Sequence, residues 1–201
     1  MEKNFELELK AQENIIIAKK EKIFSSELKK LAKNLLKKVK MRKKFVAREM
    51  ALAQARVNLV EANKDVLQNK IKNKETLDFS DEIIKNEKDF IEYHEELANK
   101  QLENAKNHET IAQLEKELAK HKISSAKLRY NAATIRIKLG KYQLKYLKAL
   151  ESKTSQEKKN IILANFRERI KSLEHSVNEI SEKEKIIKEI QQEIQKISHY
   201  S

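Results

Sequence analysis

Apolar residues recur along the chain with alternating spacings of four and three. One such run extends from Val39 to Lys74, a second from Ile111 to Ala149 and a third from Leu163 to Ile194, and most positions in each run are apolar. A mean spacing of 3.5 residues that is kept over several heptads is typical of the contact line of a left-handed coiled coil. The pattern therefore predicts long helices that pack against one another along apolar stripes.

Two short polar segments interrupt this pattern. In the first, Ser80 or Asp81 is a natural N-cap, because its side-chain oxygen accepts a hydrogen bond from the backbone of the following helix. In the second, Thr154 and Glu157 have the spacing of a capping box. We therefore place the breaks between helices near residues 76–81 and 152–155.

Three helices follow from these breaks, at about residues 4–75, 81–151 and 155–198. Most helical stability comes from packing an apolar stripe, so each helix is expected to fold back on the one before it. We predict an all-α fold, an elongated antiparallel three-helix coiled coil that forms a single domain over residues 1–201. In this arrangement residue 78 − n lies beside residue 78 + n.

The predicted seam is least apolar between Ala98 and Thr110. Gln101, Asn104 and His108 take seam positions there, and such polar residues either set the register at a cost in stability or face another chain or water. Apolar positions beyond one seam occur elsewhere, at residues 15–17 and at Ile186, Ile187 and Ile190. We therefore expect self-association, as an antiparallel homodimer.

The composition excludes many chemistries. The chain has no Pro, no Cys and no Trp, and its one Gly is Gly140. This sequence therefore lacks the residues needed for a glycine-rich phosphate loop, a nucleophile elbow or a thiolate metal site. The five His residues are dispersed, and Glu117 with His121 supplies only two ligands on one helix face. We expect no enzymatic activity, no cofactor and no metal.

Targeting signals are also missing from the sequence. No stretch approaches the roughly 18 apolar residues of a membrane span. The first 20 residues contain four glutamates and do not resemble a signal peptide. We expect a cytoplasmic protein, with peripheral membrane association if it binds lipid.

The charge is unevenly distributed. Lys and Arg number 44 against 31 Asp and Glu, a formal net charge of +13. Residues 21–48 carry a net charge of +9, residues 75–118 of −8 and residues 119–160 of +10. A fold at residue 78 pairs the acidic segment with the first basic one and leaves excess lysines elsewhere. Either these lysines form a solvated surface, or they bind an anionic partner. The candidate binding residues are Lys29, Lys30, Lys33, Lys122, Lys141, Lys145, Lys148, Lys153, Lys158 and Lys159.

Three long heptad helices with capped breaks and basic ends resemble BAR-type domains in their architecture. That resemblance implies a curved dimer that grips anionic lipid through its basic face and tips, with the lysines of residues 141–159 as tip contacts. Our first hypothesis is therefore a non-enzymatic, dimeric module that binds an anionic membrane surface.

Two other functions remain open from the sequence. One is a protein-binding scaffold, stalk or chaperone, similar in type to the basic helical hairpins that couple to rotary or secretion ATPases. The other, which we favour least, is a nucleic-acid-associated assembly protein. This hypothesis rests on Tyr130, Tyr142 and Tyr146, which lie among basic residues. Aromatic rings interleaved with basic groups can bind single-stranded nucleic acid.

Overall fold

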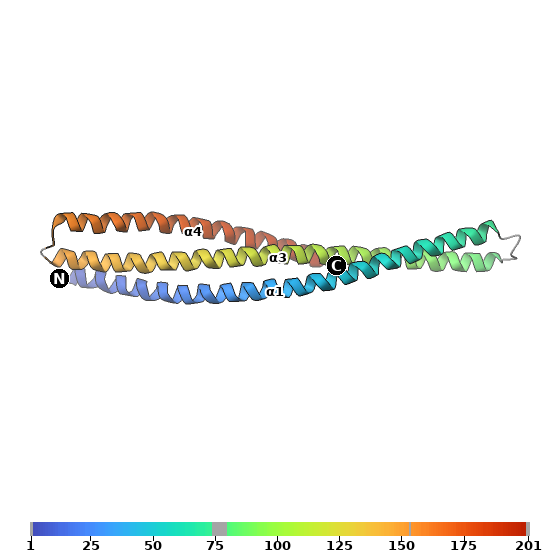
Figure 1. Cartoon of the computed structure of the whole chain (residues 1–201), viewed down its shortest axis with the longest axis horizontal. Helices are drawn as coiled ribbons and strands as arrows, with labels where there is room; N and C mark the ends of the chain where they lie inside the picture. The colour runs from blue at the N-terminus through green and yellow to red at the C-terminus, as the bar shows by residue number, and fades with distance from the viewer. Residues whose placement is uncertain (1, 74–79, 153, 200–201) are drawn as a thin grey trace. The chain divides into compact units, whose positions relative to one another are not determined.

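The computed structural model describes residues 2–73, 80–152 and 154–199. Within them the chain forms three helices, α1 (Glu2–Lys72), α3 (Asp81–Glu151) and α4 (Gln156–His199), and no strand (Figure 1). The predicted all-α three-helix fold is confirmed, and the helix ends lie within three residues of the predicted ones. Most of the first predicted break, residues 74–79, lies outside the described residues.

A serine caps the N-terminus of α3 and another caps that of α4. The backbone N–H of Ile83 donates to the Ser80 hydroxyl over 3.3 Å, which confirms Ser80 as the first cap. For α4, the backbone N–H of Lys158 donates to the Ser155 hydroxyl over 3.5 Å. The predicted capping box on Thr154 is wrong by one residue. Because α4 begins at Gln156, Thr154 precedes the cap, and its hydroxyl pairs with that of Ser152.

The chain divides into two compact units. Unit 1 contains Met1–Lys37 and Lys116–Gln192, and unit 2 contains Lys38–Glu115 and Glu193–Ser201. Helices α1 and α3 each contribute to both units, whereas most of α4 belongs to unit 1.

In unit 1, α1 and α3 meet along small residues. A buried small residue recurs at every seventh position of both helices: Ala11, Ala18, Ser25 and Ala32 on α1, and Ala119, Ala126, Ala133 and Gly140 on α3. A Cβ atom at Gly140 would lie 2.5 Å from Ile15 Cγ1 and 3.2 Å from the Ala11 carbonyl oxygen. The two backbones therefore approach more closely here than a larger side chain would allow.

The same heptad continues through unit 2 with larger residues near the first turn. Its buried members are Val39, Val46, Ala53, Val60 and Leu67 on α1, and Ile91, Ala98, Ala105 and Ala112 on α3. Val60, Leu67, Ile91 and Ala98 form an apolar cluster against which Val57 and Ile84 pack. As far as Ile71, the last described member of the predicted run from Val39, every second position is therefore buried, and most of the residues between them are half-buried. Lys74 lies outside the described residues.

Ion pairs fix the antiparallel register. In unit 2, Lys70 pairs with Glu87 and Lys64 with Glu95, both over 2.5 Å, and Arg42 pairs with Glu115. In unit 1, Arg136 donates to both carboxylate oxygens of Glu21, over 2.7 and 2.6 Å. These partners confirm the predicted pairing of residue 78 − n with residue 78 + n to within three residues.

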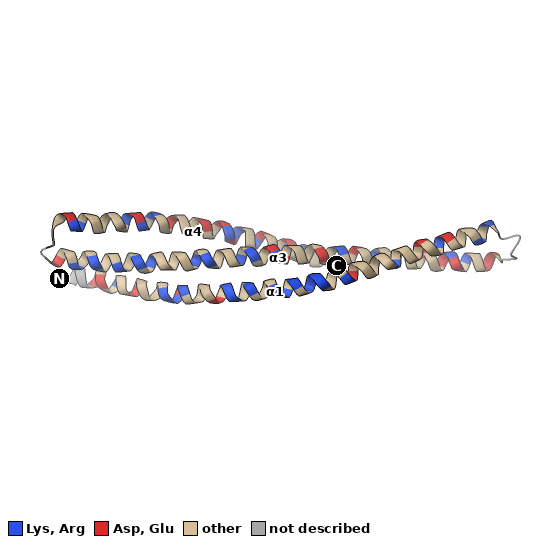
Figure 2. Cartoon of the chain, in the orientation of Figure 1, with Lys and Arg blue, Asp and Glu red and all other residues tan. Residues whose placement is uncertain are grey.

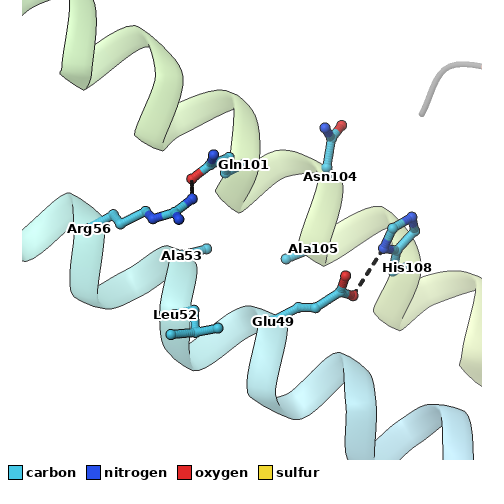
Figure 3. A pocket seen from close by; sticks show the side chains of 8 residues that line it. All are labelled: Glu49, Leu52, Ala53, Arg56, Gln101, Asn104, Ala105 and His108. Carbon is cyan, nitrogen blue, oxygen red and sulfur yellow. Dashed lines mark hydrogen bonds and ion pairs between the residues drawn. The ribbon is translucent and has the colours of Figure 1, made fainter.

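The polar stretch of α3 finds its partners within unit 2. His108 Nδ1 lies 3.1 Å from a Glu49 carboxylate oxygen, and Arg56 donates to the Gln101 side chain. Figure 3 shows these pairs with Ala53 and Ala105 between the two helices. Gln101, Asn104 and His108 line a groove between α1 and α3, as expected of residues beside the seam, and Ala98 and Ala105 take the buried positions of the seam.

Helix α4 covers one side of the α1–α3 pair in unit 1. None of its side chains is fully buried, but an apolar stripe, including Leu163, Phe166 and Ile180, is half-buried. Ile187 lines a groove with Phe24 and Leu31 of α1, so the predicted second stripe of α4 is used inside the chain. Arg129 of α3 and Glu184 of α4 form an ion pair.

We predict that Ala133→Leu destabilises the protein by about 1–3 kcal/mol, because a buried, fully packed seam position has no room for three further carbons. The matched change Ala164→Leu, at an exposed position of α4, should alter the free energy of unfolding by less than about 0.5 kcal/mol. Urea denaturation followed by circular dichroism measures both. Equal effects of the two changes would contradict the close approach of α1 and α3.

Candidate anion-binding face

On the side of the α1–α3 pair that faces away from α4 in unit 1, the heptad positions that flank the seam are acidic only toward their ends, at Glu8 of α1 and Glu151 of α3. Between these ends, the flanking positions are residues 12, 15, 19, 22, 26, 29, 33 and 36 of α1 and residues 116, 120, 123, 127, 130, 134, 137, 141, 144 and 148 of α3. None is Asp or Glu. Half are lysines, which we call the lysine face: Lys19, Lys22, Lys29, Lys33, Lys116, Lys120, Lys127, Lys141 and Lys148.

Side chains from both helices meet in a groove on this face. The groove has a volume of about 460 Å³ and is lined by Ser25, Ser26, Lys29, Ala126, Lys127, Tyr130 and Asn131. The Lys22 ammonium lies 4.6 Å from the centroid of the Tyr130 ring, within cation–π distance. The Ser25 hydroxyl donates to the Glu21 carbonyl over 2.7 Å. The lysines, the Tyr130 hydroxyl and the Asn131 amide are suitable donors for the oxygens of a phosphate or carboxylate group.

Lys120 differs from its neighbours on the lysine face because it has an acidic partner. Its ammonium donates to Glu117 over 2.7 Å, and this hydrogen bond is the main reason that the pKa of Glu117 is lowered. Glu117 therefore stays ionised and offsets the charge of Lys120. Among the described residues, no acidic side chain pairs in this way with Lys29, Lys127, Lys141 or Lys148.

The whole net charge of the protein belongs to unit 1. Unit 1 contains 28 basic and 15 acidic residues, whereas unit 2 contains 16 of each. Basic residues recur along α1 and α3 of unit 1, whereas α3 of unit 2 carries many acidic ones (Figure 2). Like charges gathered in this way attract anions over about one Debye length, or about 8 Å at physiological salt.

The predicted site residues do not form one cluster. Lys29, Lys33, Lys141 and Lys148 belong to the lysine face. Lys30 and Lys145 lie at the next heptad position outward, and Lys158 and Lys159 lie in the first turn of α4. Lys153 lies outside the described residues.

Lys122 lies on the other side of the helix pair, where it lines a groove with Glu184 and Ile187 of α4. The sequence reasoning also missed five members of the lysine face: Lys19, Lys22, Lys116, Lys120 and Lys127. Their sequence spacing from the buried alanines of the seam is the signal that would have placed them on this face.

Two large apolar side chains are exposed beside these lysines. Ile16 is 53% exposed and Ile23 is 63% exposed. Both lie one turn from Lys19 or Lys20 on the outward side of α1. A basic surface with exposed aliphatic groups is typical of helices that lie at a membrane interface.

Metal-binding clusters and membrane-spanning helices are absent from the part of the chain that the structure describes. No group of three or more His, Asp or Glu side chains is placed there to hold a metal ion, and no helix is long and apolar enough to cross a membrane. No family model, curated protein or solved structure matches the chain. The resemblance to BAR-type domains therefore rests on the three-helix architecture alone.

Proposed function

We propose that this protein is a non-enzymatic helical module that binds an anionic membrane surface through the lysine face of unit 1. The observation that carries the proposal is that eighteen flanking positions between Glu8 of α1 and Glu151 of α3 hold nine lysines and no acidic residue. Outside the lysine face, several basic residues form ion pairs with acidic ones, for example Lys64 with Glu95. A peripheral membrane location follows from the proposal.

The energetics favour a surface over a single small anion. Each lysine near an anionic leaflet contributes about 1 kcal/mol, and the groove on this face is lined by only two of its lysines, Lys29 and Lys127. A small anion at this groove would contact few of the lysines. A membrane presents many headgroups, so all the lysines of the face interact at once.

A membrane also fits the face better than a nucleic acid does. The face contains lysines and no arginine, whereas arginine is the residue most used for bidentate contacts to phosphates and bases. Ile16 and Ile23 gain from insertion at a lipid interface and gain little from a hydrated phosphate backbone. Tyr146 lines a groove with Leu163 and Phe166 of α4, so it is not placed to stack on bases.

We predict that replacing Lys29, Lys127, Lys141 and Lys148 with Gln weakens binding to anionic vesicles by on the order of a thousandfold at 0.1 M salt. The lost energy is electrostatic, at about 1 kcal/mol for each lysine. Gln has a helix propensity close to that of Lys, so the helices should stay folded. Sedimentation with phosphatidylserine-containing vesicles measures the binding.

The matched control replaces four exposed lysines of unit 2 with Gln, namely Lys72, Lys85, Lys100 and Lys106. It changes the net charge equally and should leave most of the binding intact. The membrane proposal is wrong if the unmodified protein ignores anionic vesicles, if it prefers nucleic acid at the same salt, or if the control loses as much binding as the lysine-face variant.

A second prediction separates lipid from other polyanions. Ile23→Ser should weaken binding to anionic vesicles several-fold, because it removes an apolar side chain that inserts between headgroups. It should leave binding to a soluble polyanion such as heparin unchanged. Ile161→Ser, at a comparably exposed position of α4, is the control and should change neither. Equal vesicle binding by Ile23→Ser and the unmodified protein would exclude insertion at this residue.

A further inference from the structure

Helix α1 carries a second apolar stripe in unit 2, and this stripe is exposed. Its largest members are Met41, Phe45, Leu52, Leu59 and Val66, whose exposed fractions are 74%, 61%, 65%, 61% and 53%. These five residues and four smaller or polar ones follow one another at alternating spacings of four and three without a break. We call this set the second seam: Met41, Phe45, Arg48, Leu52, Ala55, Leu59, Ala62, Val66 and Asn69.

The second seam is distinct from the contact between α1 and α3. That contact uses Val46, Ala53 and Val60, each of which follows a large member of the second seam by one residue and is buried. In unit 1 the corresponding α1 positions, Phe24 and Leu31, line a groove with Ile187 of α4. These heptad positions therefore suit a packed helix, and in unit 2 they remain exposed.

We propose that the second seam binds the second seam of another copy of this chain, with the two α1 helices antiparallel. Four large members of the seam, Phe45, Leu52, Leu59 and Val66, are placed symmetrically about the point between Ala55 and Arg56. Phe45 then faces Val66, and Leu52 faces Leu59. Ala55 and Ala62 alternate with these larger residues, which permits a close helix approach like that inside the chain.

Charge supports a second copy as the partner. In the antiparallel arrangement Lys44 of each chain lies within one helical turn of the position opposite Asp65 of the other, and both residues are exposed at the border of the seam. Unit 2 has no net charge, so two copies of it do not repel each other, whereas two copies of unit 1 would bring two charges of +13 together.

Charge also argues against a membrane at this seam. Between Asp81 and Glu115, α3 of unit 2 carries 4 basic and 10 acidic residues, which an anionic surface would repel. The length of the seam suits a coiled coil as well, since residues 41–69 extend over about 40 Å of helix and four heptads. The inference does not depend on membrane binding.

The association is tested first by mass. Equilibrium sedimentation at tens of micromolar should give a dimer for the unmodified protein and a monomer for the double variant Leu52→Glu, Leu59→Glu. Both residues are exposed within the chain, so circular dichroism should show the same helix content in the two proteins. The control variant Ala47→Glu, Gln68→Glu adds the same charge on another exposed side of α1 and should remain dimeric.

The antiparallel register is tested by disulfide formation, which the absence of Cys makes clean. Ala55→Cys lies beside the symmetry axis and should oxidise to a covalent dimer. Met41→Cys and Asn69→Cys should not do so alone but should cross-link when the two variants are mixed. A monomeric mass for the unmodified protein overturns the proposal. A dimeric mass for the Leu52→Glu, Leu59→Glu variant would place the interface on another surface and would also overturn the proposal. Efficient oxidation of Met41→Cys alone would show that the two α1 helices are parallel and would overturn it as well.

Discussion

The close packing of α1 against α3 along one small residue in every heptad is the constraint on which the other features of this protein depend. Alanine side chains bury little apolar area each, but they let two backbones approach and make contacts along a long line. At Gly140 even a Cβ atom would meet Ile15 and the backbone of Ala11. Because such a seam leaves little room for larger side chains, it favours one rotational setting of each helix about its own axis.

That rotational setting determines on which side of the α1–α3 pair each of the remaining residues lies. In unit 1, one side of the α1–α3 pair receives α4 and carries the Glu21–Arg136 and Arg129–Glu184 ion pairs. The opposite side presents the lysine face. In unit 2 the same setting pairs Arg42 with Glu115 and leaves the second seam of α1 exposed. A large apolar residue such as Leu52 is thus free for another chain because the alanine beside it forms the internal contact.

The helices and their ends could be predicted from the sequence, because the heptads are long and Ser80 lies where capping chemistry requires. The register could be predicted as well, since acidic and basic segments of opposite charge had to meet. The seam could be predicted only in part, because large apolar residues mark a helix contact in a sequence more clearly than alanines such as Ala119 and Ala126 do. The error at Thr154 has a local cause, namely that two neighbouring residues could each cap α4.

The candidate site was harder to predict because both α1 and α3 contribute residues to it. Net charge by segment located the basic regions but not the sides of the helices. Lys122 and Lys127 are five residues apart and equally basic in the sequence, yet they lie on opposite sides of the α1–α3 pair in unit 1. Only the position of the alanine seam distinguishes them, so the lysine face could not be defined before the seam was known.

The most direct measurement is a cross-link between α1 and α3 on the lysine face. Ser26 and Lys127 line the same groove, so the double variant Ser26→Cys, Lys127→Cys should react rapidly with a short bis-maleimide within one chain. The variant Ser26→Cys, Lys141→Cys keeps both cysteines on the same side but moves one by two heptads, or about 21 Å, and should not react. We predict an intramolecular cross-link in the first variant alone. A cross-link in the second variant, or in neither, would contradict the alanine-seam register and the lysine face that it creates.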